Sequence, residues 1–338
     1  MADPQSPPSP QLLFETINAY QRTGAIKAAI ELEIFTRIGE SSRTAAEIAA
    51  SCECPERGIR ILCDNLAMIG FLGKSHDRYS LTPDSAVFLD QNSPAYLGGM
   101  LPFLLNPAIS GAFDDLASTI RTGRLHTSEH GTTAPDHPVW IEFARAMGPM
   151  MVPTAHGAAE LVTLDADRDT RILDISASHG LFGIAFAKRN PRARLVALDW
   201  EPVLSVTRQN AVEAGIADRF ETIGGDAFTV DLEGDYDLAL VPNFLHHFNV
   251  SDCVRFLKRI HAALRPGGRV LIIEFVPEDD RITPPEVASF SLVMLGSTPE
   301  GDAYSKSEYQ RMLSEAGFRD VEVRSIVPTP QSAVIAVA

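Results

Sequence analysis

The stretch Arg171-Ile-Leu-Asp-Ile-Ser-Ala-Ser-His-Gly-Leu-Phe-Gly183 decides the fold of this chain. Its apolar run around Leu173 is too short for a helix and indicates a buried strand. Asp174 ends that run, small or polar residues lead to Gly180, and a helical pattern starts at Leu181. Strand, tight turn and helix form the unit that holds a ligand at the carboxyl end of a parallel sheet. Amides at the start of the helix can receive an anionic group such as a carboxylate.

This turn reads Asp-x-Ser-x-Ser-x-Gly, which differs from the Gly-x-Gly-x-x-Gly of dinucleotide-binding folds. Taken alone, it also fits an ordinary turn between a strand and a helix in any α/β protein. The pattern of the following sequence has to decide between a ligand site and a plain turn.

From residue 171 onward, apolar strand patterns alternate with helical ones. Strands are expected at 172–173, 195–198, 220–223, 237–241, 270–275, 321–326 and 333–337. Seven strands with helices between them predict a doubly wound α/β sheet. The connection between the last two strands is too short for a crossover helix, so we expect that pair to be antiparallel.

Composition limits the possible function classes. The chain has 338 residues, 45% hydrophobic content and a net charge of −15, which favours a large globular core and argues against nucleic acid as a partner. Four cysteines without a clustered second pair or histidines make no metal framework, and we expect free thiols in the cytoplasm. The proline-rich residues 1–10 resemble neither a signal peptide nor a membrane span, and we expect them to be disordered.

The N-terminal part reads as three helices followed by a hairpin. Residues 11–37 have a helical pattern that Gly24 interrupts, Thr44 with Glu47 forms a capping box, and Pro55 opens a helix that ends near Gly70. A hairpin over 71–81 completes a winged helix, which we assign to a domain at 11–93. Winged helices often bind DNA, but residues 1–90 hold eight Lys/Arg against twelve Asp/Glu, so packing or dimerisation is favoured.

Residues 94–160 read as helices with loops between them. Pro107 is expected to break the first helix, a second helical pattern covers 109–120, and a polar loop covers 123–138. Residues 140–151 then carry large apolar side chains at helical spacing. Such a stripe is either plain core or the lining of an adaptable pocket, and both readings stay open at this point.

Four features are placed at one edge of the sheet. Asp174 and Asp199 close the first two strands, and a carboxylate at the second position can accept hydrogen bonds from a ribose. Trp200 offers a flat face for a base, residues 225–228 close the third strand, and residues 264–269 form a tight turn entering the fifth. Each feature has a purely structural explanation, but all four in this order are hard to obtain by chance.

On these residues, the stretch 171–275 resembles the class I S-adenosylmethionine-dependent methyltransferases. The chain from 11 to 338 is similar to small-molecule O-methyltransferases with an N-terminal winged-helix dimerisation domain, of the plant caffeic-acid and bacterial polyketide type. The resemblance implies a Rossmann-like catalytic domain over 161–338, with 94–160 lining the acceptor pocket. It implies a cofactor, S-adenosylmethionine, released as S-adenosylhomocysteine, at Asp174, Ser176, Ser178, Gly180, Asp199, Trp200, Asp226, Ala227, Phe228 and Asn243.

The resemblance also implies the base machinery. The family's Leu-His-Asp-Trp motif falls on Leu245-His246-His247-Phe248, which makes His246 the general base for an acceptor hydroxyl and leaves open which of the two rings faces the pocket. Without the family, a pair of surface histidines is the alternative. Glu274 matches the acid that orients the base. The second acid has no direct match, because Ala303 stands at its position, and Asp302 is the expected substitute.

An apolar acceptor pocket is expected from Trp140, Phe143, Met147, Met151, Phe244, His247, Phe290 and Met294. The expected acceptor is a hydroxyl of a small aromatic or polyketide-like metabolite. The expected assembly is a homodimer, with Tyr20 or Phe14 reaching into the partner's site. Two alternatives remain: the same fold with non-methylating chemistry, suggested by the missing second acid, and a DNA-binding regulator. Serines at 176 and 178, where the family has glycine, are restricted at positive φ.

Overall fold

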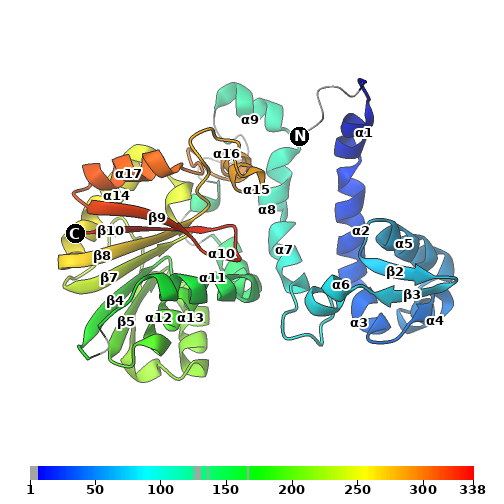
Figure 1. Cartoon of the computed structure of the whole chain (residues 1–338), viewed down its shortest axis with the longest axis horizontal. Helices are drawn as coiled ribbons and strands as arrows, with labels where there is room; N and C mark the ends of the chain where they lie inside the picture. The colour runs from blue at the N-terminus through cyan, green and yellow to red at the C-terminus, as the bar shows by residue number, and fades with distance from the viewer. Residues whose placement is uncertain (1–6, 124, 126–130, 135–136, 166) are drawn as a thin grey trace. The chain divides into compact units, whose positions relative to one another are not determined.

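The computed structural model describes residues 7–123, 125, 131–134, 137–165 and 167–338, and its ribbon is drawn in Figure 1. Most of the segment expected to be disordered, residues 1–6, lies outside the described residues. The chain divides into two compact units, 1–101 and 102–338. This division falls within the segment 94–160, which the sequence treats as linking helices.

The first unit is a winged helix. Its elements are α1 (Gln11–Ile17), α2 (Ala19–Glu31), α3 (Ile34–Ile38), β1 (Arg43–Thr44), α4 (Ala45–Ser51), α5 (Glu56–Met68), β2 (Leu72–Ser75), β3 (Arg78–Leu81), α6 (Pro83–Phe88) and the 3-10 turn η1 (Gly98–Met100). The hairpin β2–β3 is antiparallel, and β1 adds to its free edge. The predicted capping box at Thr44 and Glu47 is confirmed, as is the end of α5 at Gly70, which has φ +93°.

One prediction for this unit is wrong: Gly24 does not interrupt a helix. Helix α2 passes through Gly24, and the breaks fall at Asn18 and at Glu33, whose φ of +57° is left-handed. A single glycine weakens a helix by about 1 kcal/mol, which the packing of the later turns around Ala29 overrides. Helix α1 lacks such packing, because every one of its residues is exposed in the single chain.

The second unit is a seven-stranded sheet covered by helices on both faces. Its strands are β4 (Thr170–Ile175), β5 (Ala193–Asp199), β6 (Phe220–Gly224), β7 (Tyr236–Pro242), β8 (Leu264–Glu274), β9 (Arg319–Ser325) and β10 (Ser332–Val337), in the spatial order β6-β5-β4-β7-β8-β10-β9. All seven predicted strands are present. Strands β4 to β8 are parallel, and β10 runs antiparallel to both β8 and β9, as the short connection predicts.

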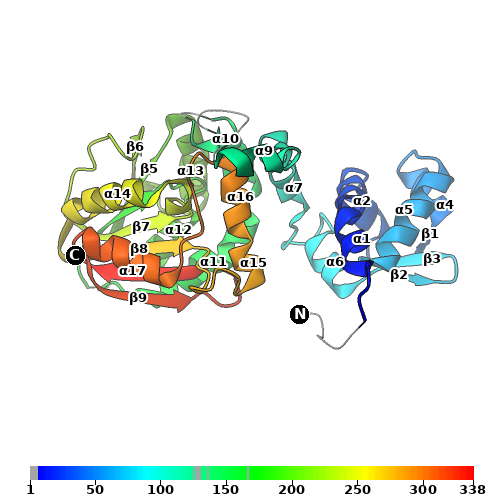
Figure 2. The same cartoon turned by 90° about the horizontal axis from the view of Figure 1, so that it is seen from above.

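The two faces of the sheet pack on different helices (Figures 1 and 2). One face, which includes Leu173 and Val241, packs on α14 (Val250–Ala263) and α17 (Lys306–Glu315). The other face, which includes Ala197, packs on α13 (Glu201–Glu213), beside α12 (Leu181–Arg189) and α11 (Gly148–Leu161). Because both faces are buried, the strands read as continuous apolar runs.

The helices ahead of the sheet are shorter than the sequence suggests. They are α7 (Leu101–Leu104), α8 (Pro107–Ser110), η2 (Gly111–Phe113), α9 (Leu116–Thr122), η3 (Gly131–Thr133) and α10 (Val139–Ala146). The single helical pattern expected over 109–120 is divided into three pieces. The expected break at Pro107 is present, because α7 ends at Leu104 and Pro107 stands in the first turn of α8, where proline fits. Residues 124, 126–130 and 135–136 of the expected polar loop lie outside the described part.

The segment 264–269, expected as a tight turn entering the fifth strand, is the first part of β8, where the pairing with β7 is irregular. The start of a parallel strand lies at the amino end of the sheet, opposite the ligand edge. The contacts agree, because the Arg265 guanidinium forms an ion pair with Asp237 at the start of β7. Three of the four features expected at one edge therefore lie together, and this segment does not.

Candidate functional site

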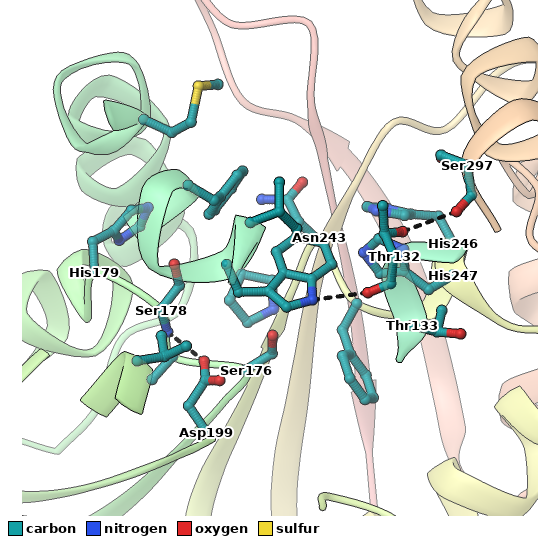
Figure 3. A pocket seen from close by; sticks show the side chains of 18 of the residues that line it. Thr132, Thr133, Ser176, Ser178, His179, Asp199, Asn243, His246, His247 and Ser297 are labelled. Atoms are coloured by element: carbon teal, nitrogen blue, oxygen red, sulfur yellow. Dashed lines mark hydrogen bonds between the residues drawn. The ribbon is translucent and has the colours of Figure 1, made fainter. Parts of the chain in front are cut away.

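A cavity of about 580 Å³ lies within the second unit, at the carboxyl ends of the parallel strands. The tips of β4 to β8 contribute Ser176, Asp199, Gly225, Asn243 and Phe275 to its wall. The strand order reverses between β4 and β7, and ligands of open α/β sheets bind at such a switch point. Figure 3 shows Ser176, Ser178 and Asp199 at one side of the pocket, and His246, His247, Thr132 and Ser297 at the other.

The loop after β4 contains three residues in the left-handed region of backbone conformation. Ser176, Ser178 and Gly180 have φ angles of +52°, +54° and +72°. Left-handed φ at two serines costs free energy that glycine would not incur, as the sequence anticipates. The two serines line the cavity, whereas Gly180 lies outside its lining and begins helix α12. The buried hydroxyl of Ser178 has no hydrogen-bond partner among the described residues.

Two buried carboxylates support this loop from below. Asp174 is fully buried, lies outside the cavity lining, and its Oδ2 accepts the Gly183 amide at 3.0 Å. Asp199 lines the cavity and accepts the amides of Ser178 at 2.8 Å and Trp200 at 2.7 Å. Burial raises the pKa of Asp174 to about 8 and that of Asp199 to about 6, because too few donors compensate the lost hydration.

The tips of β5 and β6 present flat and polar groups side by side in the lining. Trp200, Asp226, Ala227 and Phe228 all border the cavity. The Asp226 carboxylate accepts the Phe228 amide at 2.9 Å, which fixes the turn after β6. The Phe228 ring belongs to an aromatic cluster whose nearest member, Phe248, lies edge-on at 4.8 Å between ring centroids. Aromatic side chains therefore wall this part of the cavity.

The loop after β7 carries a buried pair of an imidazole and a carboxylate. His246 Nδ1 lies 2.5 Å from Glu274 Oε2, and the two side chains are 6% and 0% exposed. The other carboxylate oxygen, Oε1, accepts the amides of Phe244 and Leu245 at 3.0 Å and that of His246 at 3.4 Å. One carboxylate thus fixes both the backbone of the loop and the orientation of the ring. Because Nδ1 is engaged, Nε2 is the ring nitrogen left to meet an acceptor.

Asp302 is not brought to this pair. Its carboxylate forms an ion pair with Arg281 at 2.9 Å and lies outside the cavity lining. Arg281 also binds Glu308 at 2.6 Å, so the three side chains form an exposed network over the start of α17. Ala303, at the position of the family's second acid, is buried. The sequence suggests Asp302 as a substitute acid, and the geometry gives it a different partner.

The remaining wall of the cavity is mostly apolar. All eight predicted acceptor-pocket residues line it: Trp140, Phe143, Met147, Met151, Phe244, His247, Phe290 and Met294. They come from α10, α11, the loop after β7, and α16 (Phe290–Ser297). The stretch expected as one helical stripe is two helices that meet at Met147, where Pro149 opens α11. Of the two readings left open for this stripe, the pocket lining is the one observed.

Several lining residues were missed by sequence reasoning. His179 lies in the loop after β4; its Nδ1 accepts the Leu181 amide at 3.2 Å, and burial lowers its pKa to about 4. Its place inside the quoted motif was the available signal. Thr132, Thr133 and Ser297 gave no signal, because they reach the cavity only through tertiary packing. The acidic Glu286 was also missed. The missed apolar members are Phe103, Leu104, Ile109, Val139, Met150, Ala177, Phe182, Leu198, Val203, Pro242, Phe248, Phe275 and Val293.

In the described part of the chain, no group of three or more His, Cys, Asp or Glu side chains is arranged to hold a metal ion. Within the same ranges, none of the helices is both long and apolar enough to cross a membrane.

Comparison with known proteins identifies the family. An O-methyltransferase domain model matches residues 113–319, and an O-methyltransferase dimerisation domain model matches 14–91. The tetracenomycin polyketide synthesis 8-O-methyl transferase of Streptomyces glaucescens is 26% identical, over 93% of each chain. These findings support neither the DNA-binding nor the non-methylating alternative.

Solved structures agree. A protein from Nostoc punctiforme, solved as a candidate O-methyltransferase, is 48% identical with a TM-score of 0.94 and covers 98% of this chain and 100% of its own. Human N-acetylserotonin methyltransferase in complex with S-adenosylmethionine has the same fold, with 22% identity, a TM-score of 0.85 and 99% coverage of both chains. The chain therefore belongs to the O-methyltransferase family, and it is an S-adenosylmethionine-dependent enzyme with an N-terminal dimerisation domain.

Proposed function

We propose that this enzyme methylates a hydroxyl group of a small aromatic or polyketide-like metabolite, with His246 as the general base. The observation that carries the proposal is the buried contact of 2.5 Å between His246 Nδ1 and Glu274 Oε2 at the wall of a largely apolar cavity. An imidazole held in this way by a carboxylate can act as a general base toward a hydroxyl group. The tetracenomycin relative, by its name, acts in polyketide synthesis.

The lining below the loop after β4 fits the cofactor. Asp199 presents a buried carboxylate of the kind that accepts hydrogen bonds from ribose hydroxyls in related folds. The Ser178 hydroxyl, which has no partner among the described residues, suits the carboxylate of the cofactor. Trp200 and Phe228 supply faces for the adenine, with Asp226, Ala227, Ser176 and Asn243 beside them. Asp174 and Gly180 contribute through the loop itself, since neither lines the cavity.

The chain's own residues then prepare the acceptor. When bound, S-adenosylmethionine supplies an electrophilic methyl group attached to a sulfonium. His246 accepts the hydroxyl proton at Nε2, and Glu274 keeps the ring in the tautomer that has Nε2 free and stabilises the imidazolium that forms. The apolar wall holds the acceptor in one orientation, and orientation alone can supply several kcal/mol of the barrier. Asp302 takes no part in this scheme, because its partner is Arg281.

A direct experiment tests the reaction. The purified enzyme is titrated with S-adenosylhomocysteine in a calorimeter and then incubated with S-adenosylmethionine and a panel of naphthols and anthraquinone phenols. We expect saturable heat and a product heavier by one methylene group. If S-adenosylhomocysteine binds but none of these phenols gives an O-methylated product, that result would falsify the proposed reaction. Product carrying the methyl on carbon or nitrogen would contradict the hydroxyl acceptor.

We further propose that the chain works as a homodimer in the cytoplasm. The dimerisation-domain match and the exposed apolar residues Leu12, Leu13, Phe14 and Ile17 of α1 support self-association, since such a surface is rarely left bare. Tyr20, also exposed, stays a candidate for contact with the partner's site. All four cysteines are free thiols, which supports a reducing compartment. Sedimentation of the intact chain tests the assembly, and a monomer at micromolar concentration contradicts it.

A further inference from the structure

A second imidazole lines the cavity beside the proposed base. His246 and His247 are consecutive in the 3-10 turn η5 (Leu245–His247), and their ring centroids lie 4.3 Å apart at an interplanar angle of 56°. Both rings border the cavity, at the end where Figure 3 places Thr132 and Ser297. The sequence leaves open which of the two faces the pocket, and the structure brings both to its wall.

The His247 ring is neutral and has no hydrogen bond to the described residues. Burial, together with the neighbouring His246, holds the pKa of His247 well below its usual value, so the ring is uncharged at neutral pH. Its Nδ1 is buried without a partner among the described residues. Its contacts are aromatic instead: Trp140 lies edge-on at 5.2 Å and Phe248 at 6.2 Å between ring centroids. An atom this enclosed cannot be reached from the cavity, so the other ring nitrogen, Nε2, is the one left to bond a ligand.

The other polar groups at this end already have partners. The Thr132 hydroxyl donates to the Ser297 carbonyl at 3.1 Å, and the Ser297 hydroxyl donates to the Val293 carbonyl at 2.7 Å. The Trp140 indole N–H donates to the Thr132 carbonyl at 2.9 Å. Apart from Thr133 and the exposed Glu286 of α15 (Pro285–Ala288), the imidazoles of His246 and His247 are the polar side chains of the described lining left to bond an acceptor at this end.

The charge of the lining restricts what these imidazoles can meet. No Lys or Arg is among the described residues that line the cavity, so a carboxylate or phosphate on the acceptor would have no cation near His247. A neutral imidazole has one donor and one acceptor nitrogen, which suit an uncharged hydroxyl or carbonyl oxygen. The short separation of the two rings places that oxygen next to the reacting hydroxyl.

We infer that His247 is a specificity-determining residue that binds a second, uncharged oxygen of the acceptor, on the carbon ortho or peri to the hydroxyl that His246 deprotonates. This inference rests on the proposed function for the role of His246. The preferred acceptors are then flat aromatic compounds with two neighbouring oxygens, such as a vicinal diol of a fused ring or a hydroxyl beside a quinone carbonyl. Phenols with a single oxygen fit the same apolar wall but leave His247 unpaired.

Matched pairs of acceptors test this inference. The enzyme, loaded with S-adenosylhomocysteine, is titrated in a calorimeter with 2-naphthol against 2,3-dihydroxynaphthalene, and with 1-naphthol against 1,8-dihydroxynaphthalene. We expect at least one dihydroxy compound to bind about tenfold more tightly than its partner, the gain of one hydrogen bond. In His247→Phe the ratio should fall to about one, and His247→Gln, which keeps a donor and an acceptor, should restore part of it.

The outcomes separate cleanly. A ratio near one for both pairs in the wild type, or an unchanged ratio in His247→Phe, overturns the inference. His156→Phe is the matched control, because His156 is exposed on α11 and away from the cavity lining, and it should keep the wild-type ratio. Titration with S-adenosylhomocysteine checks that each variant is folded. A preserved ratio without methylated product, once S-adenosylmethionine is supplied, refutes the proposed function and leaves the selectivity of His247 standing.

Discussion

The loops after β4 and β7 border the same cavity, but their buried carboxylates serve them differently. Below the first loop, Asp174 accepts one amide and Asp199 accepts two, so these carboxylates act on backbone alone. Below the second, Glu274 receives three amides with one oxygen and the His246 ring with the other. The first arrangement shapes a surface for a ligand, and the second holds a side chain ready to move a proton. A carboxylate orients a reactive group only when other donors already satisfy part of it.

The largest effect is expected from His246→Ala, which tests whether the loop after β7 carries the general base. The rate of methyl transfer should fall by about 10²–10⁴, the usual contribution of a general base. The neighbouring His247 is a weaker base, because burial holds its pKa well below the usual value. Single-turnover measurement with a saturating acceptor gives this number. S-adenosylhomocysteine affinity should stay within about twofold. His156→Ala is the control, and a similar loss there would point to unfolding rather than chemistry.

The second prediction concerns the pH dependence that the first loop confers. Asp174 titrates near 3.8 when unfolded and at about 8 in the folded chain, so the folded state binds the extra proton between these values. Its contribution to the unfolding free energy therefore falls as pH rises through this window, by about 1.4 kcal/mol per pH unit. Denaturant unfolding at about pH 5 and about pH 8 should show the wild type losing stability relative to Asp174→Asn. An unchanged difference between the two proteins would contradict a protonated Asp174.

A third prediction sharpens the role of backbone fit around His246. A Cβ added to Gly301 would lie 2.2 Å from the His246 carbonyl oxygen and 3.0 Å from the His247 carbonyl carbon. Gly301→Ala should therefore displace η5, slow methyl transfer about tenfold and destabilise the chain by about 1–3 kcal/mol. Steady-state rates and thermal unfolding measure the two effects. Gly58→Ala in α5, where nothing lies within 4 Å, is the control and should lose neither.

The smallest effect is expected from Ser178→Gly in the first loop. Glycine relieves the left-handed strain at φ +54°, but it also adds entropy to the unfolded chain. The two terms nearly cancel, so the unfolding free energy should change by less than about 1 kcal/mol. Denaturant titration measures it, and calorimetry with S-adenosylhomocysteine reports the value of the lost hydroxyl. A stabilisation of several kcal/mol would mean that the loop stores far more strain than its dihedral angles suggest.

Much of the fold was predictable because local signals and the sheet agree. Apolar runs that end at Asp174, Asp199 and residue 225 indicate parallel strands. The short link before residue 332 requires the last two strands, β9 and β10, to be antiparallel. A local rule failed where packing overrides it, at Gly24 inside α2. The turn expected at 264–269 was placed at the wrong edge because its motif was read without the direction of the strand that it enters.

The candidate site was predictable where a residue stands at a strand tip, and not elsewhere. Ser176, Asp199 and His246 follow strands whose ends must meet, so their proximity follows from topology alone. From the sequence, Asp302 was expected to replace the family's second acid beside His246. Its side chain instead pairs with Arg281, about twenty positions earlier in a different loop. Sequence spacing cannot rank two partners for one carboxylate, because the choice depends on loop conformation.

By itself, the sequence determined the alternation of strands and helices, the acidic surface, the small-residue turn after β4 and the imidazole after β7. These follow from periodicity and from the chemistry of single side chains, which are local properties. Only the tertiary structure decided that Glu274 accepts the amides of the loop after β7, that Asp174 lies outside the cavity lining, and that His246 and His247 both line it. Those outcomes depend on contacts between residues far apart in the chain, and burial assigns each polar group its partner.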